Sequence, residues 1–173
     1  MTPRAAGRRG RVLAGVGLAA AAVLCGVGTW SYAQARGDDD LAYGRARDAA
    51  LDDGRSAVAA LSTLDASTKD RARTGVTHWR TVTTGPLRTQ LGRVAPAAGA
   101  SSRGVVTDAA VTALDDRAGT AKLIATVRVD TTPKGTGSAT SDRKRLEATL
   151  ARTSDGTWKV KSLSAVPVTG VTG

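Results

Sequence analysis

The chain has very few of the side chains that most often carry chemistry. Its 173 residues include one cysteine, one histidine, no phenylalanine and no asparagine, and aromatic residues make up only 3%. A single cysteine, Cys25, excludes an internal disulfide, so any folded domain must depend on an ordinary core. No Cys/His or carboxylate cluster has metal-ligand spacing. The sequence therefore predicts neither a bound metal nor a cofactor.

Acidic residues are outnumbered by basic ones. The net charge is +10, of which four arginines before residue 36 contribute +4; after that point 21 Lys and Arg stand against 15 Asp and Glu. This excess favours an anionic lipid surface or cell-wall polymer as a neighbour. Charges of both signs are interspersed, however, and no run of base-stacking aromatics accompanies them. Nucleic acid is therefore not expected as a partner.

One long uncharged stretch, residues 12–30, has the length of a membrane span. As a helix it would rise about 28 Å, close to the roughly 30 Å of bilayer hydrocarbon. Basic residues precede it and interfacial aromatics follow it: Arg8, Arg9, Arg11, Trp30 and Tyr32. The positive-inside bias then places the N-terminus in the cytoplasm and the remainder of the chain across the membrane.

A cleaved signal peptide is the competing interpretation, because Ala33-Gln34-Ala35 has the form of a cleavage site. Signal-peptide cores usually span about 7–15 residues, and this stretch is longer. We therefore favour a basic cytoplasmic tail over residues 1–11, a transmembrane helix over 12–32 and one extracytoplasmic domain over 33–173.

The first part of this domain, about residues 38–95, is predicted to be helical. From Asp38 to about Leu64, alanine and leucine recur at intervals of three, four and seven between charged residues. This pattern indicates a long amphipathic helix, with Gly54 as a candidate bend. A second helix is expected over 68–82 and a short third one over 87–94, separated by the Gly85-Pro86 break.

The second part, about residues 103–166, is predicted to form strands, followed by a tail over 167–173. Residues 121–130 and 142–153 alternate with period two, and a strand is also expected over 105–114. Asp155-Gly156 indicates a hairpin turn with positive φ at both positions, leading into a last strand over 157–166. The fold class is therefore α+β: a cone-like domain in which a long helix and shorter helices pack on a curved antiparallel sheet of about four strands.

Four short elements follow the anchor in order: Leu61-Ser62-Thr63-Leu64-Asp65, Thr74-Gly75-Val76, Asp108-Ala109-Ala110-Val111 and Asp155-Gly156-Thr157-Trp158-Lys159-Val160. With the basic tail and anchor, they make the chain resemble the Mce-associated membrane proteins, an accessory family of actinobacterial mammalian-cell-entry lipid importers. More broadly, the chain resembles the nuclear-transport-factor-2-like (NTF2-like) fold. The resemblance covers most of residues 10–166 and implies a cone-shaped domain that assists lipid import.

Catalysis would have to depend on very few residues. His78 is the one histidine on which a hydrolytic triad could be built, and a lone helical histidine is usually structural. Related cone-fold enzymes use an Asp or His base inside an apolar pocket. The corresponding candidates, Asp108 and Asp130, fall at strand positions typical of solvated carboxylates. We therefore expect that the protein is not an enzyme.

The largest apolar side chains are expected to fill the cone between helix and sheet. Trp79 and Trp158, together with Val127 and Leu61, are the candidate core or cavity residues. The small companions of the tryptophans fit either a pocket or a close approach of the elements.

These observations predict a single-pass membrane protein whose extracytoplasmic domain is an accessory or scaffold subunit of an envelope complex. Its expected partners are the membrane and envelope proteins, with self-association as a further option. The resemblance would make that complex a lipid importer. The alternative is a module that binds a small ligand or lipid in its own cone cavity.

Overall fold

The structure, a computed structural model, describes residues 38–166. The chain divides between Gly44 and Arg45 into two units. Residues 38–44 are the described part of the first unit; they are helical, and Leu41 and Tyr43 are exposed. The predicted tails and membrane anchor lie outside the described residues. Within residues 38–166, no helix combines the length and the apolar character needed to cross a membrane.

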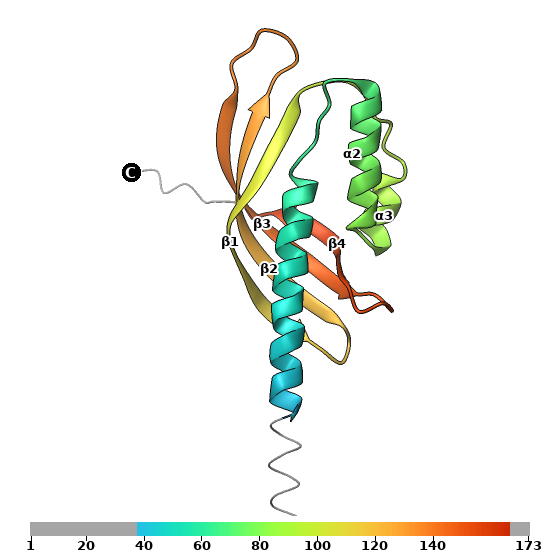
Figure 1. The fold of residues 1–173 in the computed structure, drawn as a ribbon, viewed down its shortest axis with the longest axis vertical. Helices are drawn as coiled ribbons and strands as arrows, with labels where there is room; N and C mark the ends of the chain where they lie inside the picture. The colour runs from blue at the N-terminus through green and yellow to red at the C-terminus, as the bar shows by residue number, and fades with distance from the viewer. Residues whose placement is uncertain (1–37, 167–173) are drawn as a thin grey trace, which may run out of the picture. The chain divides into compact units, whose positions relative to one another are not determined.

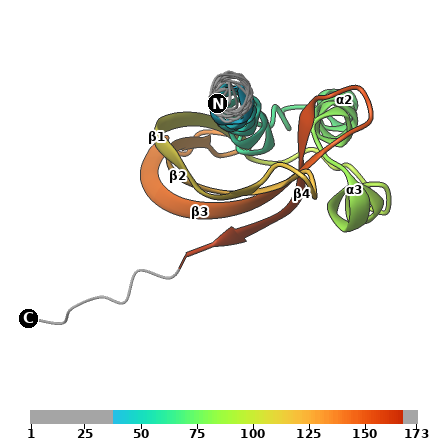
Figure 2. The same ribbon diagram turned by 90° about the horizontal axis from the view of Figure 1, so that it is seen from below.

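The second unit consists of helices followed by one sheet (Figure 1). Helical residues 45–61 come first, followed by α2 (Lys69–Thr81) and α3 (Gly85–Leu91). The strands are all antiparallel and lie in chain order: β1 (Ser101–Asp115), β2 (Thr120–Thr132), β3 (Thr140–Arg152) and β4 (Trp158–Ala165). The sheet curves around helix 45–61 (Figure 2). This arrangement confirms the predicted α+β fold class.

The core lies between helix 45–61 and the inward face of the sheet. Along β2, every second residue is buried, which is the predicted period of two: Ala121, Leu123, Ala125, Val127 and Val129. The same core cluster includes Ala50, Ala57 and Val58 of the helix and Trp158 and Val160 of β4.

Gly54 lets the helix approach the sheet closely. A Cβ at this position would lie 2.8 Å from Cδ1 of Leu123 and 2.9 Å from Cδ1 of Leu150. Residues 45–61 form a helix without a break at Gly54. The glycine therefore has a packing role that differs from the bend suggested by the sequence.

Two bulges in β1 explain why its apolar residues do not alternate. Thr107 and Thr112 have no direct partner on β2. Each extra residue changes the face on which the following side chains lie, and each increases the local twist. The apolar residues of β1 that pack against the core are consequently spaced by three, two and three positions: Val106, Ala109, Val111 and Leu114.

The turn between β3 and β4 differs from the prediction. Gly156 has a φ of +87°, but no non-glycine residue in the described part of the chain has a positive φ. The amide of Gly156 donates to the carbonyl of Thr153 (2.9 Å). The Asp155 carboxylate accepts from the Thr153 hydroxyl and the Thr157 amide. The prediction of positive φ at both turn positions was therefore wrong. The strands are connected by a three-residue loop with glycine in the left-handed position.

The residues at the start of each short helix favour the beginning of a helix there. Thr68 precedes α2, and its Oγ1 accepts from the amide of Arg71 (3.2 Å), as an N-cap does. The helix α3 begins at Gly85, earlier than the predicted residue 87. Pro86 is compatible with this start because the first turn of a helix has no use for its missing N–H.

Candidate functional site

Two surface grooves meet at the loop that follows the first helix, residues 62–68, which we call the junction loop. The β1 groove, of about 630 Å³, lies between helix 45–61 and the first half of β1. The α2 groove, of about 560 Å³, lies between that helix and α2. Both are lined by Ala59, Thr63, Leu64 and Asp65. The junction loop is thus a shared wall, and we take it as the centre of the candidate site.

Backbone pairing and close packing fix the junction loop. Leu64 and Ser102 exchange two backbone hydrogen bonds of 2.8 Å in a short antiparallel bridge. A Cβ at Gly104 would lie 2.2 Å from Cβ of Ser62, and one at Gly75 would lie 2.5 Å from Cδ1 of Leu64. The Leu-x-x-Leu-Asp and Thr-Gly elements therefore meet in space, and their glycine and leucine positions serve packing.

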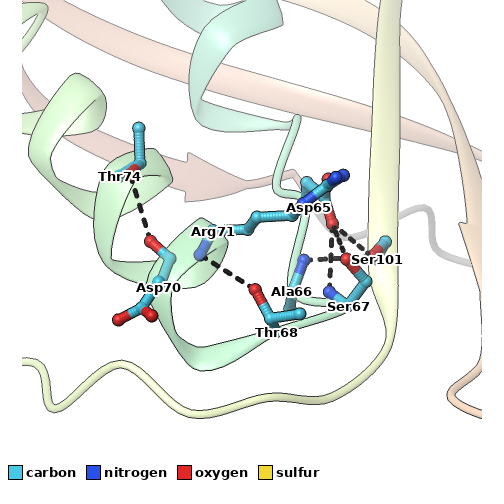
Figure 3. Close-up of polar contacts among 8 residues, drawn as sticks. All are labelled: Asp65, Ala66, Ser67, Thr68, Asp70, Arg71, Thr74 and Ser101. Atoms are coloured by element: carbon cyan, nitrogen blue, oxygen red, sulfur yellow. Dashed lines mark hydrogen bonds and ion pairs between the residues drawn. The ribbon is translucent and has the colours of Figure 1, made fainter.

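Asp65 connects the junction loop to α2 and β1 (Figure 3). Its Oδ1 accepts from the amide (3.0 Å) and hydroxyl (2.6 Å) of Ser67 and from the Ser101 hydroxyl (3.4 Å). Its Oδ2 accepts from Nη1 of Arg71 at 2.7 Å.

The Ser67 hydroxyl, followed by Arg71, holds the pKa of the Asp65 carboxyl well below its usual range. The carboxylate therefore stays ionised at neutral pH. A group with that property is a poor proton donor or acceptor for catalysis near pH 7. Since the Asp65–Arg71 pair is largely exposed, we assign it an orienting role and only a small contribution to stability.

Trp79 caps the first helix. Its Nε1 donates to the carbonyls of Ala60 (2.8 Å) and Thr63 (3.0 Å), at the point where the helix ends. The Ala60 carbonyl also accepts from the amide of Thr63 (3.0 Å), so the indole is its second donor, and the same indole bonds the Thr63 carbonyl just beyond the helix. Trp79 is half-buried at this helix end, whereas the sequence suggested that it fills the cone.

The other candidate core residues lie in the packed interior or at its margin. Val127 is fully buried and Trp158 is 2% exposed. Leu61 is partly buried against the same cluster. The amide of Trp158 donates to Oδ2 of Asp53 (2.9 Å), and the guanidinium of Arg152 lies 5.6 Å from the indole centroid. Val127 and Trp158 thus belong to the buried core, Leu61 packs at its margin, and Trp79 lies at the helix end.

The three acid–base candidates lie in different hollows. His78 is exposed and lines the α2 groove, Asp130 lines the β1 groove, and Asp108 lines a smaller hollow on the sheet. Asp130 accepts from the Ser141 hydroxyl (2.6 Å) and pairs with Nε of Arg128 (3.6 Å). The described residues contain no cluster of three or more His, Cys, Asp or Glu that could hold a metal ion.

Some polar contacts could not be found by sequence reasoning. Asp53 falls on the charged side of the predicted helix, yet it anchors the start of β4 through the Trp158 amide. Arg152 pairs with Asp116 across two turns at 2.7 Å. No local pattern marks either contact, because each joins residues at least 36 positions apart.

Five predicted site residues cannot be placed, because they lie outside the described part of the chain. They are the residues that flank the expected membrane anchor: Arg8, Arg9, Arg11, Trp30 and Tyr32. Their proposed position at the membrane surface remains a prediction from sequence.

A solved structure of another protein shares the fold of this chain. CagV, a VirB8 homologue of the type IV secretion system from Helicobacter pylori strain 26695, is similar with a TM-score of 0.53 and 10% identity, over 70% of this chain and 98% of that chain. An IcmL-like type IV secretion system protein from Legionella pneumophila strain Philadelphia 1 aligns with a TM-score of 0.49 and 14% identity, over 69% and 91%. No protein-family model and no curated protein matches the sequence. The similarity to CagV shows that the two chains share a fold, of the NTF2-like class.

Proposed function

We propose that this chain is a non-catalytic accessory or scaffold subunit of an envelope complex, anchored by its N-terminal segment with its folded domain outside the cytoplasm. The observation that carries the proposal is the fold: 70% of the chain matches nearly the whole of a VirB8 homologue of a secretion system. A domain of this class can work by shape and contact. The hydrophobic stretch at 12–30, with arginines before it, supports membrane attachment.

The arrangement of polar residues supports a role without chemistry. A nucleophile or general base needs its partner within hydrogen-bond reach. His78, Asp108 and Asp130 line separate hollows, and Asp65 is committed to Ser67, Ser101 and Arg71. The polar network at the junction loop thus orients three elements of the domain.

The resemblance to Mce-associated proteins makes a lipid importer the first candidate for the complex. The likeness to CagV makes a secretion complex the second candidate. Both are assemblies in which an anchored domain would hold other subunits in place.

A ligand-binding module is the alternative, and the β1 groove is the observation that favours it. Its volume of about 630 Å³ falls within the roughly 300–1,000 Å³ typical of small-molecule sites. Hydroxyl groups and apolar side chains line it together, including Ser101, Thr63 and Val106.

Crosslinking in native membranes tests the proposal. The full-length tagged protein is crosslinked, purified and analysed for both protein and lipid. A protein partner at fixed stoichiometry is expected. Recovery of the chain alone with a stoichiometric bound lipid would contradict the scaffold role and support the ligand-binding alternative.

A further inference from the structure

Arginines gather on the sheet face that is turned away from the core. Directly paired residues in an antiparallel sheet project from the same face. Arg128 of β2 pairs with Arg143 of β3, and these positions alternate with the buried Val127 and Val129. Arg103 of β1 is paired with Asp130, and Arg145 of β3 is paired with Thr126. Asp130 and Thr126 each lie two residues from Arg128 on β2, so these side chains share its face. We call these four exposed residues the arginine face: Arg103, Arg128, Arg143 and Arg145.

The charges on this face are only partly neutralised. Two like charges directly opposite each other on adjacent strands destabilise a sheet, and Arg128 and Arg143 are such a pair. Arg128 has one long ion pair, to Asp130 at 3.6 Å. Within residues 38–166, Arg103, Arg143 and Arg145 form no ion pair. The face also carries Asp108, Asp130 and Glu147, so its excess of positive charge is small and centres on the opposed Arg128 and Arg143. Carboxylates of another molecule would complete the charge balance there.

A shallow hollow adjoins the arginine face. It has a volume of about 260 Å³, and its lining includes Ala110, Ile124, Asp108 and Arg145. This is below the roughly 300–1,000 Å³ of sites for whole small molecules, so it suits one apolar side chain of a partner. Side chains that fill pockets, and arginines, are enriched among the residues that dominate binding energy at protein–protein interfaces.

We propose that the arginine face and this hollow dock an acidic segment of a partner protein, which places one apolar side chain beside Ile124. The inference rests on the proposed scaffold function and adds the chemistry of the partner. All four positions are arginine, whose planar guanidinium matches carboxylates in a bidentate fashion.

A protein segment fits this face better than a membrane or a nucleic acid. Asp108, Asp130 and Glu147 project from the same face and would repel a uniformly anionic lipid surface. Among the described residues, no aromatic side chain lies there to stack on bases. A polypeptide can instead space its carboxylates to meet the arginines and avoid the acids.

Site-specific photocrosslinking of the full-length protein in native membranes tests this inference. Ala110, which lines the hollow, is replaced by p-benzoylphenylalanine; Gln90 on α3 serves as the reference position. The expected adduct at position 110 is a protein whose crosslinked peptide is rich in Asp and Glu. Arg143→Gln with Arg145→Gln should reduce its yield at least tenfold. The matched control, Arg80→Gln with Arg88→Gln, removes the same charge from α2 and α3 and should change the yield less than twofold.

Each other outcome overturns the inference. The inference fails if the crosslinked peptide lacks acidic residues or if the adduct contains lipid alone. It also fails if the two double variants reduce the crosslinking yield equally. A protein adduct at position 90 with none at 110 would refute the arginine face but leave the scaffold function standing. If neither position nor the chemical crosslinking yields a protein partner, the scaffold function itself fails.

Discussion

Gly54 gives the sharpest test of how the helix packs on the sheet, because two effects there have opposite signs. Replacing a glycine within a helix by alanine normally stabilises a protein by about 0.5–1 kcal/mol. At Gly54, the added Cβ would lie 2.8 and 2.9 Å from Cδ1 of Leu123 and Leu150. Ordinary carbon contacts are about 3.5–4.0 Å, so each leucine must move by roughly 0.6–1.2 Å. Both leucines are fully buried, and such overpacking costs about 1–3 kcal/mol.

Gly44, which lies in the helical residues 38–44, is the matched control, since a Cβ there has nothing within 4 Å. Subtracting the effect of Gly44→Ala from that of Gly54→Ala removes the helix-propensity gain and leaves the packing cost. We expect the free energy of unfolding of Gly54→Ala to be about 1–3 kcal/mol below that of Gly44→Ala. At about 2–4 °C per kcal/mol, its melting temperature should be about 2–12 °C lower. Thermal and urea unfolding of the full-length protein, followed by circular dichroism, measure this difference. Equal stabilisation by both substitutions would refute the close approach at Gly54.

Three further predictions concern the core, the junction loop and the topology. Trp158→Ala should lower the free energy of unfolding by about 3–5 kcal/mol in urea titrations, whereas Asp142→Ala at an exposed strand position should change it very little; equal small effects would remove Trp158 from the core. The pKa of Asp65 is lower in the folded state than in the unfolded state, where it is about 4. Its stabilising effect is therefore fully present above about pH 4 and is lost progressively as the pH falls from there toward the folded pKa. The urea midpoint of Asp65→Asn should therefore approach that of the wild type as the pH is lowered from 6 to 3, and a pH-independent gap would contradict the ionised network. A reporter fused after Gly173 should be active only outside the cytoplasm, and recovery of a soluble mature form beginning at Arg36 would favour the signal-peptide interpretation.

Sequence alone predicts those parts of the fold that depend on local periodicity. The buried positions of β2 follow period two, so the strand and its inward face could be identified from Ala121 to Val129. The apolar residues of β1 follow no single period, because the bulges at Thr107 and Thr112 depend on pairing with β2. A bulge likewise leaves Lys161 of β4 unpaired. Leu163 therefore packs against the core, although it lies three residues from the buried Val160 and strict alternation would place it on the opposite face.

The candidate site was less predictable than the fold, since its contacts join distant segments. The sequence indicates that Trp79 has an apolar environment, but not that its indole reaches the end of the preceding helix. The Leu-x-x-Leu-Asp element was visible as a motif, whereas its bridge to Ser102 follows from the path of the junction loop. The arginine face required the register of three strands, because each strand contributes only one or two of its members.

Loss of every acid–base candidate at once is the most direct test of the central claim, that the protein acts by contact and not by chemistry. The variant combines His78→Asn, Asp108→Asn and Asp130→Asn and is expressed in place of the wild type, with membrane level and circular dichroism measured in parallel. We expect partner association and cellular function to be retained, since these three side chains line separate hollows. Asp108→Asn and Asp130→Asn remove negative charges beside the arginine face, so they should not weaken docking of an acidic partner segment. Complete loss of function in a folded protein at a normal membrane level would contradict the scaffold account and indicate a catalytic role for these residues.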